Sequence, residues 1–576
     1  MRHLAAASLV LVAAAAQWLP AAHFDVLIRG GRVLDGTGAT WILADVAVDD
    51  GRVASIGKNS TDTADKVIDA AGQIVAPGFI DVHTHADYDL YDLPLAENFI
   101  RDGVTTIVTG NCGSSPTDVA DYFATLEEKG VAVNVATLYG HNTVLRKTKG
   151  PIAGELTEEQ FAEAQRLVEK AMQDGAVGFS TGLIYTPGQW STTEEIIALN
   201  RISAAYGGIY VSHMRSESTE IMEAIDEALR IGRETGSRVQ ISHFKMPSDV
   251  SRRVGTARAS LAKVEAARAE GQEVWIDQYP YTASSTSLST MLPDWVLEEG
   301  PDKSREILSD PAQEARILAD MRDSHEINRQ RKDLSYAVVA SCRAMPEING
   351  LNIKQVAQIF RLREKRGAEV DFRAIPEKKW PKVNMTDQYR AVIALQIAGG
   401  AGMVFHTMSE EDVEIIMASP LVSICSDSGV RRFGQGVPHP RGYGSNARVL
   451  GRYVRERNVI PIEEAIRKMT SMPALAFRLH DRGLLREGYW ADIVVFDPAT
   501  VIDKSTFEDP HHYSEGFRAV IVNGVPVVEN DAVVGAKPGK PIRRRSTAAP
   551  ASELSLRPSS DFPVSPSQVA GQPAVN

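Results

Sequence analysis

Short runs of alternating apolar and polar residues occur near both ends of the chain. The first segment contains FDVLIRGGRVLDG, ADVAVDDGRVASIG and KVIDAAGQIVAPG, in which Gly and Asp separate the runs. The pattern returns late in GLLREGYWADIVVFDP and RAVIVNGVPVVENDAVVG, where Asn-Gly and Asn-Asp lie between apolar runs. Such alternation, interrupted by turn residues, is typical of antiparallel hairpins. We therefore expect two β segments, at 23–75 and 481–545, that pair into one β domain.

Between these segments, short apolar runs alternate with amphipathic stretches. One such stretch, TEEQFAEAQRLVEKAMQDG, has apolar residues at helical spacing and ends at Gly175. Eight runs are rich in β-forming residues: GFIDVHTHAD, GVTTIVTGNCG, VNVATLYGH, GAVGFSTGLIY, GGIYVSHMR, SRVQISHFK, QEVWIDQYPY and PLVSICSDS. Repeated strand–helix units predict a parallel α/β sheet, and eight of them predict a closed (β/α)8 TIM-like barrel over 76–294 and 401–480. An open doubly wound sheet is the alternative.

Residues 295–400 interrupt this alternation. They are rich in charged residues, as in QEARILADMRDSHEINRQRKDL, and later contain Lys and Pro, as in FRAIPEKKWPKVNM. The charged stretch has a helical character, so we expect an inserted helical segment between two barrel strands. At this position an insertion can form a cap or lid over the strand ends. The alternatives are a solvated decoration or an oligomer contact.

Length, composition and charge indicate a soluble protein of more than one domain and argue against a nucleic-acid-binding or disulfide-rich protein. The 576 residues are too many for one ordinary domain and suggest two or three. Hydrophobic residues make up 43% and charged residues 24%, as in a soluble globular protein. The net charge of −12 argues against a general nucleic-acid binder, because phosphate binding requires basic surfaces. The three cysteines, Cys112, Cys342 and Cys425, do not form a disulfide framework pattern.

The two ends of the chain differ in composition from the rest. A short basic start precedes an apolar stretch and then small residues, which resembles a secretory signal peptide over 1–22. We therefore expect export, to the periplasm or out of the cell, with no stable membrane span after signal removal. A buried helix or an uncleaved anchor is the alternative. Residues 546–576 are rich in Ser, Pro and Ala with little periodicity, so we expect a disordered tail.

Side chains that can bind a metal stand at the ends of several predicted strands. Because side chains alternate between the faces of a strand, Asp81, His83 and His85 share one face. The runs VTGNC, IYVSH, VQISH and SICSD likewise end in a possible ligand on the face of their apolar or small residues. In a barrel these ends meet at the C-terminal mouth. The candidate metal ligands are His83, His85, Cys112, His213, His243 and Asp427.

This set of donors predicts a zinc site that activates water. Imidazole, thiolate and carboxylate groups suit Zn²⁺. Six ligands exceed one tetrahedral site, and the thiolate of Cys112 can bridge two ions. Zinc lowers the pKa of water to about 7 and polarises a carbonyl oxygen. Asp427 is placed to accept the proton of that water and pass it to a leaving nitrogen. Cys425, two residues before it, is expected to fill the barrel interior.

The motifs around these residues resemble the amidohydrolase superfamily and, more closely, its N-acyl-D-amino-acid deacylases (D-aminoacylases). The matching motifs are GFIDVHTHADYD, GNCG, TGLIYTPG, SHMR, SHFK, DQYPYTAS, MSEEDVEIIMASPLVSICSDSG, HPRGYG and GLLREGYWADIVVFDP. They follow the family's order over roughly residues 24–535. The resemblance implies a metal-dependent barrel, a small β-sandwich built from both termini and an inserted segment. It also implies one or two Zn²⁺ ions per chain, with cysteine in place of the bridging carboxylated lysine of many amidohydrolases.

The resemblance also assigns roles to single residues. His83, His85 and Asp427 would serve one metal position, and Cys112, His213 and His243 the other, with Asp427 as the catalytic acid/base. The implied substrate-binding residues are Tyr185, Lys245, Tyr281 and Arg441, around the carboxylate of a small-molecule N-acyl amino acid. The residues themselves support two of these roles. Lys245 shares the inward face of His243, and arginine binds carboxylate through two hydrogen bonds. Tyr279 competes with Tyr281, and Arg215 is a further cation whose alternative is a structural role.

The expected activity is therefore zinc-dependent hydrolysis of N-acyl-D-amino acids to a carboxylate and a free D-amino acid. The preference for the D configuration rests on the resemblance alone. A cyclic amidase of the dihydroorotase or hydantoinase kind is the alternative enzyme, and a non-catalytic scaffold is the alternative outside enzymes. The loop SGVRRFGQGVPHPRGYG after Asp427 departs from the family, since it is longer, more basic and begins with Ser428 instead of glycine. Its Arg431 and Arg432 would favour an acidic substrate such as an N-acyl-D-glutamate.

Overall fold

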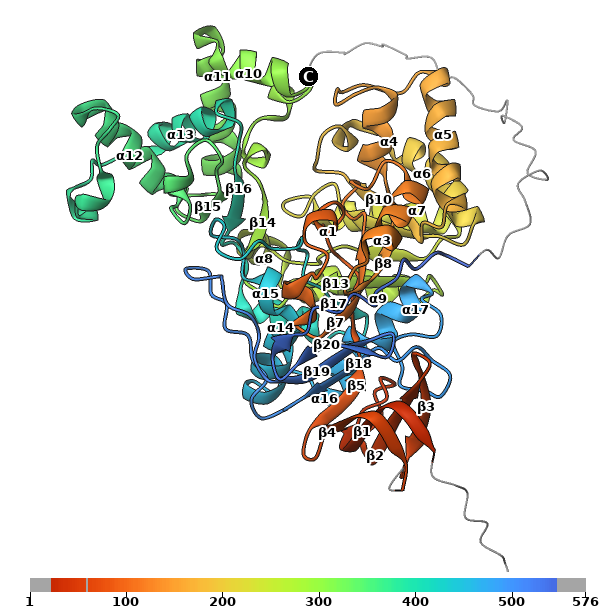
Figure 1. Ribbon diagram of the computed structural model, residues 1–576. Helices are drawn as coiled ribbons and strands as arrows, with labels where there is room; N and C mark the ends of the chain where they lie inside the picture. The colour runs from red at the N-terminus through yellow and green to blue at the C-terminus, as the bar shows by residue number, and fades with distance from the viewer. Residues whose placement is uncertain (1–21, 59–60, 546–576) are drawn as a thin grey trace, which may run out of the picture.

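The computed structural model describes residues 22–58 and 61–545. A barrel occupies the centre, a β domain lies below it, and an inserted segment stands at the upper left (Figure 1). The predicted signal peptide at 1–22, except for Ala22, and the predicted disordered tail at 546–576 lie outside the described residues. Among the helices within the described ranges, none is both long enough and apolar enough to cross a membrane.

The parallel strands close into a barrel of eight. They are β6 (Phe79–Asp81), β7 (Val104–Thr109), β8 (Asn134–Thr137) with β9 (Tyr139–Gly140), β10 (Gly178–Gly182), β11 (Ile209–His213), β12 (Val239–Ile241), β13 (Val274–Gln278) and β17 (Val422–Ile424). Parallel pairing joins the strands in the order β6-β7-β8 in one sheet and β9-β10-β11-β12-β13-β17 in another. Only Leu138 separates β8 from β9, so the two sheets are continuous there. The segments that follow the first strand, β6, and the last strand, β17, are also paired: Asp427 N donates to His83 O and His85 N donates to Ser428 O, both at 2.9 Å. The predicted eight strands and their closure are confirmed.

Helices follow the strands and cover the outside of the barrel (Figure 1). They include α3 (Val119–Lys129), α4 (His141–Thr148), α5 (Glu158–Gln173), α6 (Thr193–Ala205), α7 (Ile221–Thr235), α9 (Ala257–Ala269), α14 (Glu410–Ala418), α15 (Arg441–Arg448) and α16 (Ile462–Met469). The amphipathic stretch predicted from the sequence is α5. Thr157 accepts a hydrogen bond from Gln160 N, and the Gln160 side chain accepts one from Thr157 N, so two free donors of the first turn are satisfied.

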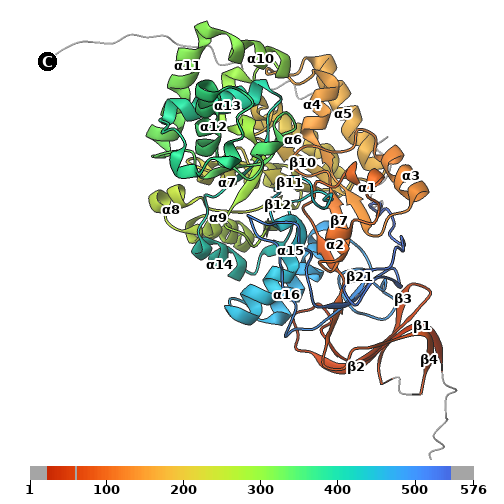
Figure 2. The ribbon, with the colours of Figure 1, turned by 60° about the vertical axis from the view of Figure 1, so that its left-hand side comes forward.

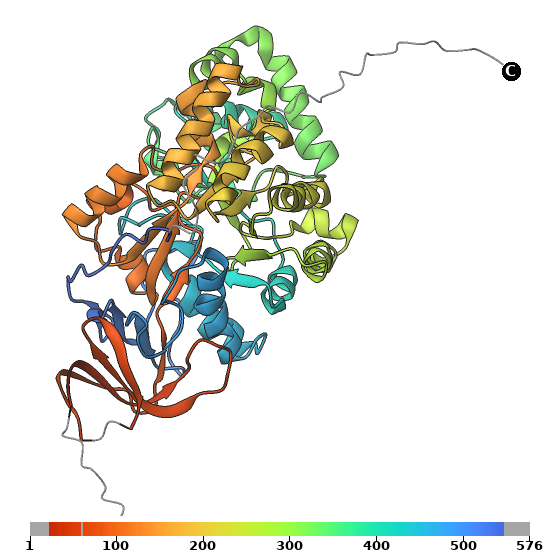
Figure 3. The ribbon, with the colours of Figure 1, turned by 90° about the vertical axis from the view of Figure 1, so that its right-hand side faces the viewer.

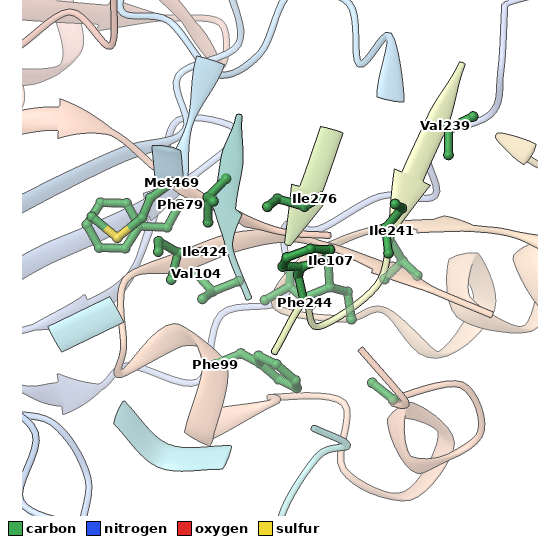
Figure 4. Close-up of a cluster of buried hydrophobic side chains, with 14 of the residues drawn as sticks. Phe79, Phe99, Val104, Ile107, Val239, Ile241, Phe244, Ile276, Ile424 and Met469 are labelled. Carbon is green, nitrogen blue, oxygen red and sulfur yellow. The ribbon is translucent and has the colours of Figure 1, made fainter. Parts of the chain in front are cut away.

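Apolar side chains of the strands and their covering helices form the main hydrophobic core. Ile107, Ile241, Ile276 and Ile424 come from β7, β12, β13 and β17, and Figure 4 shows them with their neighbours. Each is at most 1% exposed. Burial of one such side chain stabilises the folded state by about 1.5–3 kcal/mol. This core holds the strands, and therefore their ends, in a fixed arrangement.

The two ends of the chain build one nine-stranded sheet. Its strands are β1 (His23–Val33), β2 (Ile42–Asp49), β3 (Arg52–Gly57), β4 (Thr63–Asp69), β5 (Ile74–Pro77), β18 (Ile493–Phe496), β19 (Phe517–Val522), β20 (Val525–Glu529) and β21 (Ala532–Val533). Antiparallel pairing of β5 with β18 joins the early strands to the late ones, which lie together in Figure 3. Buried side chains of β1 and β2 share a core with those of β18 and β19, so the sheet folds over itself as a sandwich.

The insertion contains helices and also a small sheet that the sequence analysis did not predict. Its helices are α10 (Pro301–Ser309), α11 (Pro311–Arg322), α12 (Ile353–Arg366) and α13 (Met385–Ile397), which lie together at the top in Figure 2. Antiparallel strands β14 (Ser284–Ser287), β16 (Gly402–Phe405) and β15 (Ala337–Ser341) form the sheet. The first two lie just outside the expected range of 295–400. The segment has its own hydrophobic core, which includes Cys342.

The last described residues run along β8 of the barrel and the residues just before it. Gly539 N donates to Val131 O, and Ile542 N donates to Val135 O, both at 2.8 Å. The backbones approach so closely at Gly539 that a Cβ there would lie 2.0 Å from Val133 O. This segment therefore connects the β domain to the barrel, and the contact requires glycine at position 539.

Replacing Gly539 by alanine is expected to lower the free energy of unfolding by about 1–3 kcal/mol, because the added methyl group overlaps a carbonyl oxygen. Chemical denaturation measures this difference. Gly57→Ala is the matched control, since a Cβ there meets nothing within 4 Å. Its effect should stay within about 0.5 kcal/mol. Equal losses in the two variants would contradict the close approach at Gly539.

Candidate metal centre

The six predicted ligands meet at one end of the barrel. They follow or end the strands β6, β7, β11, β12 and β17. Cys112 Sγ lies among three imidazoles, at 3.3 Å from His83 Nε2, 3.5 Å from His213 Nδ1 and 3.6 Å from His243 Nε2. Asp427 Oδ1 lies 3.1 Å from His85 Nε2 and 3.6 Å from His83 Nε2. Side chains that are up to 344 positions apart in sequence, from His83 to Asp427, therefore form one cluster.

Three of these residues have a left-handed backbone. The φ angles are 52° at Cys112, 33° at His243 and 50° at Asp427. A positive φ costs a residue with a side chain about 1–2 kcal/mol, because its Cβ approaches the following carbonyl oxygen. In each case the strand has just ended, and the chain turns sharply where its side chain joins the cluster. Backbone strain of this kind is concentrated at functional sites.

The donors fit zinc. Three groups bring their ligand atoms within 4.8 Å of one another: His83 with His85 and Cys112, Cys112 with His213 and His243, and His83 with His243 and Asp427. Nitrogen and sulfur ligands of one tetrahedral zinc lie about 3.6 Å apart, close to the spacings around Cys112. His213 Nδ1 and His243 Nε2 are only 2.7 Å apart. These two nitrogens must separate by about 0.7 Å to bind one ion.

The surroundings favour the ligand forms of the thiol and the carboxyl group. Burial alone would raise the pKa of Cys112, but the charge of His83 and hydrogen bonds from His213 and His243 hold it well below its usual range. Burial would also raise the pKa of Asp427, and the nearby Arg441 guanidinium, 2.7 Å away, lowers it well below its usual range. Thiolate and carboxylate are the forms that bind a metal.

Two further carboxylates, the buried Asp277 and the half-buried Glu217, orient the histidines. Asp277 Oδ1 lies 3.2 Å from His83 Nδ1, which leaves Nε2 of that ring facing Cys112. Glu217 Oε1 lies 2.9 Å from His243 Nδ1, and its Oε2 lies 3.6 Å from His213 Nε2. A carboxylate on the second ring nitrogen fixes the tautomer of a metal-binding histidine and raises its basicity. Each carboxylate therefore selects which nitrogen its histidine presents to the cluster.

The sequence analysis identified neither of these carboxylates. Asp277 had a local signal, because it is an acidic residue inside the otherwise buried run VWIDQ. Glu217 had none. It follows His213 by four residues in a loop, where no strand periodicity indicates the direction of its side chain.

A cavity of about 320 Å³ opens beside the ligands. Three of the four predicted substrate contacts, Tyr185, Lys245 and Arg441, line it, and so does Tyr279, the alternative to Tyr281. The Arg441 guanidinium lies 4.5 Å from the centre of the Tyr279 ring. Within the described ranges the buried hydroxyl of Tyr279 has no hydrogen-bond partner. The Tyr185 hydroxyl shares a hydrogen bond with Thr286 of β14 at 2.9 Å.

Other predicted residues lie away from this cavity. The Tyr281 hydroxyl is 3.5 Å from Asp503, and its ring packs against the guanidinium of Arg448, so the structure does not bring it to the ligands. Arg215 has a structural role, because its guanidinium binds Glu227 and two backbone carbonyls.

The two arginines of the loop after Asp427 also lie elsewhere. Arg431 donates to the Ser428 hydroxyl at 2.9 Å, and Arg432 pairs with Asp92 at 2.9 Å. Neither residue lines the cavity at the ligands. The expectation of an acidic substrate, which rested on these arginines, has no support in their positions.

A second cavity of about 530 Å³ continues from the first toward the insertion. Ile184, Tyr185 and Lys245 line both cavities. The barrel contributes Trp190, and the insertion contributes side chains of its own, among them Met291, Leu292, Leu297, Tyr336 and Phe405. The insertion thus forms one wall of the cavity that leads to the six candidate ligands.

Residues 178–182 read GFSTG, the Gly-x-Ser-x-Gly pattern of a serine nucleophile. The surroundings of Ser180 are incompatible with that role. It is fully buried in β10, and its hydroxyl donates to Gly110 O at 2.5 Å and accepts from Gly113 N. Ser180 therefore supports the turn that carries Cys112.

Asp277→Asn is expected to weaken zinc binding about 10- to 100-fold, because asparagine no longer supplies the charged acceptor for His83. Competition with a chromophoric chelator measures the affinity. Asp412→Asn is the control, since Asp412 is a buried acid whose carboxylate accepts hydrogen bonds from Ala257 N and the Ser409 hydroxyl instead of from a histidine. The role of Asp277 would be disproved by unchanged zinc affinity in a folded Asp277→Asn protein.

Comparisons with known proteins agree with this geometry. The amidohydrolase family model matches residues 66–262 and 353–528. D-aminoacylase of Alcaligenes xylosoxydans xylosoxydans is 36% identical over 544 residues, covering 90% of this chain and 98% of the relative. N-acyl-D-glutamate deacylase of the same organism is 35% identical over 556 residues, covering 92% and 99%.

A solved structure matches over the same length. It is the N-acyl-D-glutamate deacylase of Bordetella bronchiseptica, in complex with zinc and a phosphonate that mimics the tetrahedral intermediate. Its TM-score is 0.74 at 32% identity, and the match covers 90% of this chain and 100% of that chain. Together with the six donors, these similarities show that the chain belongs to the amidohydrolase family, within its group of N-acyl-D-amino-acid deacylases.

Proposed function

We propose that the protein is a zinc-dependent deacylase that hydrolyses the amide bond of N-acyl-D-amino acids. One observation carries the proposal: the cavity that exposes the metal ligands also exposes two cations, Lys245 and Arg441. An N-acyl amino acid carries its scissile amide one carbon away from a carboxylate. The metal ligands would hold the ion that activates the amide, and the two cations beside them can bind the carboxylate. The site therefore matches both the amide and the carboxylate of this substrate. The relatives named above act on N-acyl-D-amino acids, and they support the D configuration.

The two cations are already charge-paired with acidic groups of the centre. Lys245 Nζ lies beside Glu217 Oε1 and also donates to His243 O at 3.1 Å. The Arg441 guanidinium pairs with Asp427 and donates to Ser285 O at 3.3 Å. Both cations thus keep a fixed position, and among the described residues Nε of Arg441 has no hydrogen-bond partner, so its N–H remains for a substrate carboxylate.

Hydrolysis then needs a proton acceptor and a proton donor at the scissile amide. Zinc, when bound, polarises the amide carbonyl and lowers the pKa of water to about 7. Asp427 is a carboxylate at neutral pH, since its pKa is held well below the usual range, so it can accept a proton from the attacking water. It then delivers that proton to the leaving nitrogen. The products are a carboxylate and a free D-amino acid.

The alternatives drawn from the sequence are not favoured by the site. A cysteine, Cys112, stands among the ligands in the bridging place where a carboxylated lysine was expected for a cyclic amidase. A non-catalytic scaffold requires no intact set of donors, whereas all six are present and buried or half-buried here.

We also propose that the enzyme is exported to the periplasm or secreted. The support is the composition of residues 1–22, with a basic start, an apolar stretch and small residues before the first strand. N-terminal sequencing of protein from the periplasmic or secreted fraction tests this proposal. A mature N-terminus near Ala22 is expected, and full-length protein confined to the cytoplasm would rule it out.

The substrate assignment is tested with a panel of N-acetyl-D- and N-acetyl-L-amino acids, hydantoin and dihydropyrimidines. We expect acetate release from the D series alone, and loss of this activity after treatment with a chelator, because the donors hold the ion that activates water. Activity should return when zinc is restored. Turnover of the cyclic amides in place of the D series would refute the proposal.

Asp427→Asn should lower kcat by about 10²- to 10⁴-fold, because asparagine cannot accept the proton of the attacking water. Steady-state kinetics with parallel measurement of bound zinc separates this effect from loss of metal. Ser423→Ala on β17, the strand that Asp427 follows, is the control, since the buried hydroxyl of Ser423 has no partner among the described residues. A zinc-loaded Asp427→Asn protein with wild-type kcat would remove Asp427 from the mechanism.

A further inference from the structure

His439 lies two residues before Arg441 and contacts it through the backbone. Arg441 N donates to His439 Nδ1 at 3.0 Å, and His439 Nε2 lies 2.8 Å from the carbonyl oxygen of Ala283. A ring nitrogen that accepts a hydrogen bond carries no proton, so the proton of the neutral ring is on Nε2, where the carbonyl of Ala283 accepts it. One tautomer therefore satisfies both contacts at once.

The surroundings keep this ring neutral and fixed. His439 is 1% exposed, and burial, together with the charge of Arg441, lowers its pKa well below the usual range. Aromatic rings enclose it: the ring centres of Phe507, Tyr281 and Tyr279 lie 5.0, 5.2 and 5.9 Å away. Phe507 comes from the connection between β18 and β19, so the β domain also helps to hold the ring. Rotation of the imidazole would require movement of these neighbours.

The other end of this contact is the root of the insertion. Ala283 immediately precedes β14, and the side chain of Arg441 donates to Ser285 O on the same strand. Val437, in the loop before His439, donates to Ala340 O of β15 at 2.8 Å. The backbone of Arg441, through His439, and its guanidinium, directly, are thus both connected by hydrogen bonds to the segment that carries β14. The guanidinium of Arg441 also pairs with Asp427 and lies over the ring of Tyr279.

We infer that His439 is a positioning residue that holds Arg441 in place for the substrate carboxylate by tying it to the first strand of the insertion. This inference rests on the proposed function, in which Arg441 binds that carboxylate. It assigns the insertion a second role besides covering the cavity. In this role, β14 fixes the position of the Arg441 guanidinium relative to the rest of the site. The inference gives His439 no contact with substrate, metal or reacting atoms.

Three substitutions separate the two contacts of His439. Asparagine retains an acceptor near the place of Nδ1, glutamine retains a donor near the place of Nε2, and phenylalanine retains the ring without either. The substrates are the N-acetyl-D-amino acid that the wild type cleaves fastest and its carboxamide, which lacks the carboxylate. Acetate release is measured for both, with bound zinc and thermal unfolding as checks that each variant is folded and loaded.

His439→Phe should raise KM for the acid about tenfold, as expected when a hydrogen bond to a charged group is lost, while KM for the carboxamide stays within twofold. His439→Asn and His439→Gln should each recover part of the preference for the acid. In an Arg441→Ala background, His439→Phe should cause no further loss of that preference, because residues acting through one contact are not additive. Equal losses on acid and carboxamide, or full additivity with Arg441→Ala, would overturn the inference.

A crystal structure of the His439→Phe variant keeps this inference distinct from the proposed function. If the wild type cleaves no N-acyl-D-amino acid, the proposed function fails, and the position of Arg441 in that structure still decides the role of His439. We expect the guanidinium to leave its place beside Asp427 and Ser285. A guanidinium that stays there would show that His439 does not position it.

Discussion

Two backbone hydrogen bonds close the barrel and assemble the metal centre in the same place. They join His83 O to Asp427 N and His85 N to Ser428 O, each at 2.9 Å. Two of the histidines follow the first barrel strand and Asp427 follows the last, so closure of the sheet is what brings them together. An open sheet with the same eight strands would leave these ligands at opposite edges. The chemistry of the protein therefore depends on barrel closure, which the surrounding apolar core stabilises.

Paired charges explain how so many ionisable groups remain buried at this mouth. An isolated buried charge is costly, and it is tolerated when it is paired and hydrogen-bonded. Asp277 accepts hydrogen bonds from His83, from the backbone of His243 and from Gln240, while Glu217 pairs with Lys245. These partners also determine function, because they select the nitrogen that each histidine presents to a metal. The same contacts thus satisfy buried charge and prepare the ligands.

The insertion and the β domain both reach the barrel mouth, although neither supplies a predicted metal ligand. The insertion walls the outer cavity and, through β14, contacts Tyr185 and Arg441. The β domain sends Phe507 toward His439 from the connection between β18 and β19. The barrel supplies the reactive groups, and the two added parts shape the space that selects and orients a substrate. Divergence of substrate preference among relatives can arise in these parts while the ligands stay unchanged.

The sequence by itself predicted the eight strands and the six candidate ligands at their ends, because both follow from the regular alternation of side chains along a strand, and the hairpin patterns at the two chain ends predicted one β domain. It also singled out Lys245 and Arg441. Only the tertiary structure decided between Tyr279 and Tyr281, placed Arg431 and Arg432 away from the cavity, and revealed Glu217 and the sheet of the insertion. These features lie in loops or pair strands distant in sequence. There the direction of a side chain is set by three-dimensional packing, which leaves no periodic signal in the chain.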